Sequence, residues 1–170
     1  MKLVSKEGVH QTLTDFSNVI SELTEKQINQ VPFEGSWTAG EVAGHLLRSL
    51  KNSSALLQRN TAESNRPADE KEEQVIKFFS DTSKKMKNPD FTSPEKSHYT
   101  KEEIIDGFNN IEKDLTEAVE SLDLSMICKS YELPGFGEFT RHEWLTFYLT
   151  HVQRHTGQLK RIKSMVSSNS

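Results

Sequence analysis

Three segments of the chain open with a threonine that is followed three residues later by a glutamate and then by apolar residues at helical spacing. They are "TAGE" at residues 38–41, "TKEE" at 100–103 and "TRHE" at 140–143. In this capping box the two side chains satisfy N–H groups that a helix leaves unpaired at its first turn. Long runs of alternating apolar and polar residues, which would indicate strands, are missing. The sequence therefore predicts a helical protein.

The apolar spacing predicts four long helices, over about residues 2–26, 38–60, 100–122 and 140–165. The clearest pattern belongs to the third, whose apolar residues alternate steps of four and three: Ile104, Phe108, Ile111, Leu115, Ala118 and Leu122. That stripe is typical of a helix that packs one face into a bundle core. We expect an all-α fold, a four-helix bundle, in a single domain over residues 1–170.

The connection over residues 61–99 is the least regular part of the chain. It is polar and charged in "TAESNRPADEKEE" and carries two prolines in "KNPDFTSPEKSHY". We predict a flexible linker here, with a short helix at about residues 72–85 that carries Val75, Ile76, Phe78 and Phe79. Further along, Pro134, Gly135 and Gly137 in "LPGFGEF" predict a turn before the last helix.

Composition excludes several classes of function. The net charge is −4 and no basic block is present, so binding to nucleic acid through its phosphates is not expected. No apolar run approaches the roughly 20 residues that span a bilayer, so we expect no membrane partner. The one cysteine, Cys128, excludes an intramolecular disulfide and favours the reducing cytoplasm.

Two histidines in "TFYLTHVQRHTGQL" are four residues apart, His151 and His155. This spacing puts both on one face of a helix, close enough to bind one metal ion. The same face carries apolar neighbours, among them Trp144, Tyr148 and Leu159. Spacing alone leaves two interpretations open, because half-buried histidines that bond to carbonyls or water would give the same pattern.

A third histidine would distinguish these interpretations. His45 lies beside the core position Leu46, and its neighbours Ala43 and Gly44 are small enough to let another helix approach. Three histidines from two helices would leave one position of the metal open, which is the pattern of catalytic rather than structural zinc. A lone packing histidine remains the alternative for His45.

The other candidate residues have weaker support. His10, His98 and His142 have no neighbouring ligand residues in a metal-binding pattern, and we expect them to be structural or surface residues. Glu41 and Tyr148 are the only candidates for an acid or base beside the site, and Glu41 already has a role in a capping box. No catalytic residue and no organic cofactor site can be assigned from the sequence.

The segment "SWTAGEVAGHLLRSL", followed about a hundred residues later by "HVQRHTGQLKRI", resembles the DinB/YfiT-like family of metalloenzymes. The resemblance covers nearly the whole chain and is weakest over residues 61–99. It implies an up-down-down-up four-helix bundle and a divalent metal ion, zinc or nickel in many members. The ligands it implies are His45, His151 and His155. Gln158 matches the family's Gln-Leu pair, which implies that it supports a ligand.

Members of this family include thiol-dependent S-transferases that use bacillithiol or mycothiol, and homodimers are common among them. The resemblance therefore implies a metal-dependent enzyme, an S-transferase or a hydrolase, that acts on a small electrophilic substrate. Its partners would be a low-molecular-weight thiol, the substrate and a second copy of the chain. A metal-binding or interaction module without turnover is the alternative, and a bundle with packed histidines and no metal is a third.

Overall fold

The computed structural model describes residues 1–86 and 89–168, and these residues are mostly helical. The elements in chain order are α1 (Lys6–Ser21), α2 (Glu25–Ile28), α3 (Ala39–Leu50), α4 (Ser53–Gln58), β1 (Thr61–Ala62), α5 (Glu72–Ser80), the 3-10 helix η1 (Asp90–Thr92), α6 (Lys101–Ser121), β2 (Ile127–Leu133), β3 (Gly137–Thr140) and α7 (Arg141–Ser168). None of the helices in these ranges is long and apolar enough to cross a membrane.

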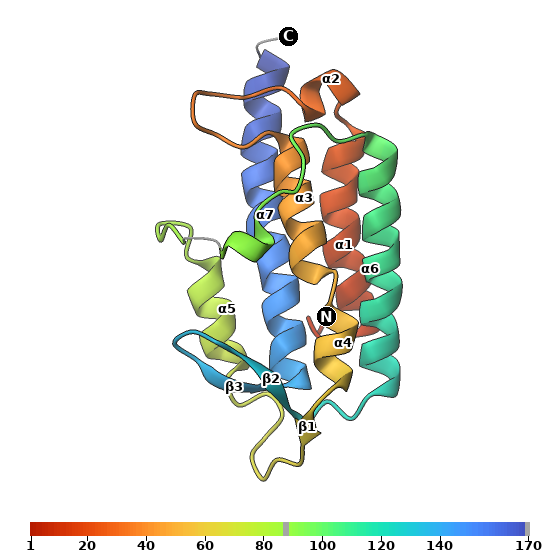
Figure 1. Cartoon of the computed structure of the whole chain (residues 1–170), viewed down its shortest axis with the longest axis vertical. Helices are drawn as coiled ribbons and strands as arrows, with labels where there is room; N and C mark the ends of the chain where they lie inside the picture. The colour runs from red at the N-terminus through yellow and green to blue at the C-terminus, as the bar shows by residue number, and fades with distance from the viewer. Residues whose placement is uncertain (87–88, 169–170) are drawn as a thin grey trace.

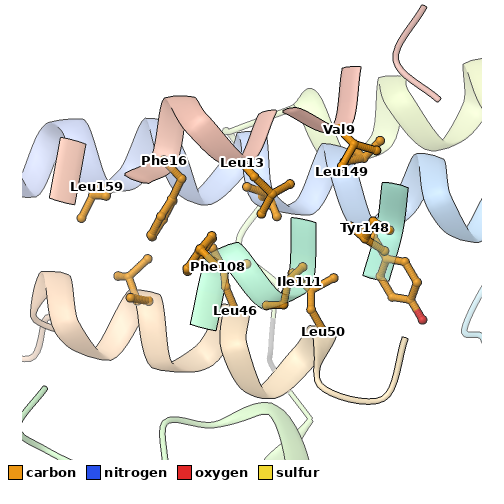
Figure 2. Packing of buried hydrophobic residues seen from close by; sticks show 14 of the residues in the cluster. Val9, Leu13, Phe16, Leu46, Leu50, Phe108, Ile111, Tyr148, Leu149 and Leu159 are labelled. Atoms are coloured by element: carbon orange, nitrogen blue, oxygen red, sulfur yellow. The ribbon is translucent and has the colours of Figure 1, made fainter. Parts of the chain in front are cut away.

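The core lies between the four long helices, which run side by side along the molecule (Figure 1). Helix α1 packs against α6 and α7, and α3 packs against the same two helices. The rings of Phe16 and Phe108 stack in the centre, with centroids 4.5 Å apart. Figure 2 shows the interior that these helices share, with side chains from all four: Val9, Leu13, Phe16, Leu46, Leu50, Phe108, Ile111, Tyr148, Leu149 and Leu159. The expectation of a mostly helical protein, in which amphipathic helices pack around an apolar core, is confirmed.

The capping boxes at residues 38–41, 100–103 and 140–143 all form. In the first, the Thr38 N–H donates to Glu41 Oε1 (3.1 Å) and the Glu41 N–H donates to Thr38 Oγ1 (3.0 Å). Helices α3, α6 and α7 therefore begin where the sequence predicts.

Two of the predicted helices are each divided in two. The range 2–26 holds α1 and the start of α2, because Thr24 and Gln27 form a further capping box that starts a new helix. The range 38–60 holds α3 and α4, because Asn52 leaves helical geometry with φ −105° and ψ 14°. Thr24 with Gln27 and Asn52 are visible in the sequence, but the apolar spacing continues across each break, so it predicts one uninterrupted helix.

A three-stranded antiparallel sheet, in the order β1-β2-β3, was not expected from the sequence. The predicted turn is present, with Gly135 and Gly137 at φ 88° and 71°, and it joins β2 to β3. Strand β2 exposes four consecutive residues, 129–132, so it lacks the alternation by which strands are recognised. The prediction of an all-α fold is therefore corrected to a mostly helical fold with a small sheet.

We call residues 61–86 and 89–99 the crossover segment. It holds the predicted short helix, α5, which starts at Glu72 and ends at Ser80, five residues before the predicted end. Helix α5 packs along α7 (Figure 1). The described part of this segment thus lies on the bundle and carries β1, α5 and η1.

A buried carboxylate fixes the crossover segment to the start of α7. Glu143 is fully buried and accepts hydrogen bonds from the two terminal guanidinium nitrogens of Arg66, Nη1 and Nη2 (2.6 and 2.8 Å). It also accepts from the backbone N–H groups of Lys71 (2.8 Å) and Thr140 (2.9 Å). Burial alone would raise the pKa of Glu143, but these donors outweigh it and hold the pKa below its ordinary value.

Tyr99 packs on the small residues of α3. A Cβ placed on Gly44 would overlap the Tyr99 hydroxyl and ring, and one on Gly40 would lie 3.2 Å from the Tyr99 side chain. The small residues beside His45 therefore admit an aromatic side chain of the crossover segment, where the sequence suggested another helix.

We predict opposite effects of alanine at two helical glycines. Gly44→Ala should lower the free energy of unfolding by about 1–3 kcal/mol, because Tyr99 must move to admit the new methyl group. Gly157→Ala in α7 should raise it by up to about 1 kcal/mol, because its Cβ would lie 3.7 Å from Arg161 and alanine favours helix. Urea denaturation of metal-free protein measures both. Equal stability of the two variants would contradict this packing.

Candidate metal centre

Three histidine rings converge between α3 and α7. His45 lies on α3 and is buried, and the half-buried His151 and His155 lie one turn apart on α7. The Nε2 atom of His151 is 3.2 Å from Nε2 of His45 and 3.1 Å from Nε2 of His155. Within the described residues these three form a group that could hold a metal ion. The structure thus brings together the three histidines that the sequence singled out.

The outer nitrogens of two rings are held by oxygen atoms. Nδ1 of His45 lies 2.7 Å from the Thr92 carbonyl oxygen, and Nδ1 of His155 lies 2.7 Å from Gln158 Oε1. Both oxygens accept hydrogen bonds, so each Nδ1 must carry the proton and donate it. A neutral ring with its proton on Nδ1 has a free lone pair on Nε2. His45 and His155 therefore present lone pairs to the centre of the cluster.

His151 is positioned by ring packing. Phe147, one turn earlier on α7, stacks on it with centroids 5.4 Å apart and an angle of 13° between the planes. Its Nδ1 atom is buried and has no hydrogen-bond partner among the described residues. The Nε2 atom faces the two neighbouring rings, so the third nitrogen also points to the centre.

This arrangement fits a bound cation better than it fits three packed rings. If His151 carries its proton on Nε2, it can donate that proton to only one of His45 and His155, and the lone pair of the other faces no donor. If it carries the proton on Nδ1, its Nε2 lone pair faces both other lone pairs at 3.1–3.2 Å. A tetrahedral ion with bonds of about 2.0–2.1 Å spaces its ligand nitrogens about 3.3–3.4 Å apart. The observed separations are close to that value, so the residues present fit a metal ion of this kind.

All three rings stay neutral at neutral pH. Burial is the main cause and lowers the pKa of each: that of His45 below its ordinary value, that of His151 well below it, and that of His155 to about 4. Around His151 and His155, neighbouring histidines and the positive charge of Arg154 add to the effect. Neutral imidazole is the form that binds metals.

The remaining histidines lie away from the centre. His10 pairs with Glu112 (2.6 Å), His98 lies 3.9 Å from Glu25, and His142 pairs with a glutamate of α5, Glu72. These contacts agree with the structural or surface role expected for them.

Neither acid-base candidate joins the cluster. The Glu41 side chain accepts a hydrogen bond from the Thr38 N–H at the start of α3. Tyr148 is buried, and burial raises the pKa of its hydroxyl group. Burial also raises the pKa of the Cys128 thiol to about 11, so it stays protonated. Cys128 therefore offers no thiolate nucleophile here.

Sequence reasoning missed three neighbours of the cluster. The Thr92 carbonyl and the Phe147 ring position ligands, and Trp37 contacts the His45 ring with centroids 5.3 Å apart. Arg154, between the two α7 ligands in sequence, donates to the carbonyl oxygens of Phe79 (3.2 Å) and Asp81 (2.9 Å) at the end of α5. Of these residues, Phe147 had a signal in its spacing, four before His151, and Trp37 had one in the segment "SWTAGEVAGHLLRSL" that carries the family resemblance.

The depressed histidine pKa values predict a pH-dependent stability. Between the ordinary pKa of 6.5 and about 4 for His155, the unfolded chain binds a proton that the folded chain excludes. The free energy of unfolding of metal-free protein should therefore fall as the pH is lowered through this window. Urea denaturation should give a smaller fall for His155→Ala, whereas His98→Ala should behave like the unmodified protein. The same fall in all three proteins would contradict the prediction.

Comparison with known proteins identifies the family. The profile of the DinB superfamily matches residues 9–159, a range that includes all three histidines. The uncharacterized protein YuaE of Bacillus subtilis (strain 168) is 26% identical over 149 residues, which cover 88% of this chain and 91% of that protein. No solved structure matches the chain. Since the profile extends from the first long helix to the last, the chain belongs to the DinB superfamily.

Proposed function

We propose that this chain is a divalent-metal-dependent enzyme whose metal ligands are His45, His151 and His155. The observation that carries the proposal is the convergence of three Nε2 atoms without a fourth protein ligand in the described cluster. Structural zinc sites use four protein ligands, whereas catalytic sites use three and keep one position for water or substrate. The site is therefore of the catalytic type.

The metal we propose is zinc or nickel. Three neutral imidazoles suit zinc, nickel, copper and iron, and the family resemblance favours the first two. When bound, such an ion would supply Lewis acidity at the open position, which favours the deprotonated form of a thiol or a water.

The chain's own residues orient the ligands. The Thr92 carbonyl and the Gln158 amide oxygen each hold an Nδ1 proton, so that His45 and His155 keep their Nε2 lone pairs directed inward. Such outer partners also raise the basicity of the ligands they hold. Phe147 fixes the plane of the His151 ring.

The reaction we propose is attack on a small electrophile by a low-molecular-weight thiol, which makes the protein a thiol-dependent S-transferase. The nucleophile must come from a cosubstrate because Cys128 is buried and protonated. Hydrolysis, with water in place of the thiol, uses the same site.

A second candidate is a metal-binding or interaction module without turnover. One observation favours it: the described cluster contains no carboxylate that would act as general acid or base. Turnover distinguishes the two candidates.

Three broader assignments belong to the same proposal. We propose that α1, α3, α6 and α7 form the up-down-down-up bundle of the family. In Figure 1, α1 and α7 run in one direction and α3 and α6 in the other.

We propose that the protein is located in the cytoplasm, in keeping with its single, buried cysteine. A homodimer is proposed from the family resemblance alone.

The proposal predicts both metal content and activity. Protein purified without an affinity tag should contain about one metal ion per chain by elemental mass spectrometry. His45→Ala and His151→Ala should lose it, and His98→Ala, a matched change at an exposed histidine, should keep it. With bacillithiol or mycothiol as cosubstrate and 1-chloro-2,4-dinitrobenzene as electrophile, loss of the metal should slow transfer by about a hundredfold or more.

Two results would overturn parts of this account. Stoichiometric metal without transfer of any bacterial thiol, and without hydrolysis, would support the module in place of the enzyme. Little metal, even after incubation with zinc and nickel, would make the histidines packing residues and remove both candidates.

A further inference from the structure

Four aromatic rings form a continuous series from the surface to the histidine cluster. We call Phe91 of η1, Tyr131 of β2, and Trp144 and Phe147 of α7 the aromatic panel. The ring centroids of Phe91 and Tyr131 are 6.4 Å apart and those of Tyr131 and Trp144 are 6.0 Å apart. The centroids of Trp144 and Phe147 are 5.7 Å apart. These are ordinary separations for contacting aromatic pairs.

The panel is linked to the cluster through Phe147 by a ring contact and through Phe91 by the next residue in the chain. Phe147 stacks on His151, with centroids 5.4 Å apart. At the other end, Phe91 directly precedes Thr92, whose carbonyl oxygen holds the Nδ1 proton of His45. The panel therefore lies beside the three imidazoles.

The outer end of the panel is open to solvent. Phe91 is 60% exposed and Tyr131 is 39% exposed. Two large rings from separate segments thus meet each other in water, although apolar surface in water is unfavourable. A ligand that covers both rings would remove this surface from water.

The inner end of the panel carries an unpaired donor. The Trp144 side chain is 2% exposed, and its Nε1–H has no acceptor among the described residues. Its ring neighbours are Tyr131, Phe139, Phe147 and Tyr148, and none of them accepts this hydrogen bond. A buried donor of this kind is costly unless an acceptor reaches it. Tyr131 is the exposed member of these neighbours, so its side is the natural route for an acceptor from outside.

The panel consists of Phe91, Tyr131, Trp144 and Phe147 and includes no lysine, arginine or histidine. Lysines lie over the rings of Phe139, Phe78 and Tyr99, and no such cation–ring contact of the described residues involves a panel ring. The panel's own side chains therefore offer an anionic group no opposite charge. A neutral oxygen, such as that of a carbonyl group, matches the single N–H of Trp144.

We propose that the aromatic panel binds the aromatic ring of an uncharged aryl carbonyl compound, and that the carbonyl oxygen accepts the Trp144 Nε1–H bond. The ring of the ligand packs on Phe91 and Tyr131. This inference rests on the proposed function for the reaction that follows, and it specifies the class of substrate as an aryl carbonyl electrophile. In that reaction the thiol sulfur bonds to the carbonyl carbon, the C=O π bond breaks, and the oxygen takes up the thiol proton.

Acetophenone tests the proposal, with methyl cyclohexyl ketone as its saturated counterpart. The chain has two tryptophans, so ¹H–¹⁵N spectra contain two indole signals, which Trp37→Phe assigns. In zinc-loaded protein, acetophenone should shift the Trp144 indole signal more than that of Trp37. Its Kd from this titration should be at least about threefold lower than that of the saturated ketone, because the panel favours flat rings.

Variants at the exposed rings test whether the panel binds the ligand, and they leave the buried core unchanged. Phe91→Ala and Tyr131→Ala should each raise the Kd for acetophenone at least about threefold. Phe33→Ala should leave it unchanged, because Phe33 is 56% exposed, has no described ring contact with the panel and is thus a matched control. An unmoved Trp144 signal, or equal binding of both ketones by all variants, would overturn the proposal.

The same titration in metal-free protein separates this inference from the proposed function. A Trp144 shift with acetophenone in a protein that neither binds metal nor turns over would support the panel and overturn the enzyme. Metal-dependent transfer to aliphatic electrophiles, with no Trp144 response to acetophenone, would support the enzyme and overturn the panel.

Discussion

Two hydrogen bonds determine what the histidine cluster can do. The Thr92 carbonyl and the Gln158 amide oxygen take the Nδ1 protons of His45 and His155, which leaves both Nε2 lone pairs directed at one point. Burial keeps the rings neutral, and His151 can donate at most one proton from Nε2, so at least one of these lone pairs faces no donor within the cluster. A bound cation would satisfy it. Binding of a metal ion and stability of the fold should therefore be coupled in this protein.

The acceptor for His45 comes from a segment with few apolar residues, and arginines hold that segment in place. Arg66 pairs with the buried Glu143, and Arg154 donates to two carbonyl oxygens at the end of α5. Arg48, one turn after His45, donates to the Ser93 carbonyl oxygen (2.8 Å). Arginine suits this task because its planar, permanently charged group presents five donors. The crossover segment is thus positioned by charge-assisted hydrogen bonds to a carboxylate and to the backbone.

Local signals in the sequence predicted the starts of α3, α6 and α7 and the pair His151 and His155, because capping boxes and i,i+4 pairs depend on neighbouring residues. His45 was indicated as a ligand by the family resemblance. The sheet was missed because β2 exposes four consecutive side chains and lacks alternation. The partner of His45 was missed for a different reason. A backbone carbonyl belongs to every residue, so nothing in the identity of Thr92 marks it as an acceptor. The contact of Phe91 with Tyr131 joins two separate segments of the chain, η1 and β2, and one sequence carries no record of it.

The tautomers of the histidines test the account most directly. Long-range ¹H–¹⁵N correlation spectra of metal-free protein at pH 7 report which nitrogen of each ring carries the proton. We predict protonation at Nδ1 and a bare Nε2 for both His45 and His155, with the Nε2 signals of all three histidines moving together when zinc is added. Protonation of His45 or His155 at Nε2, or signals unchanged by zinc, would contradict the claim that the fold directs these lone pairs toward a metal ion.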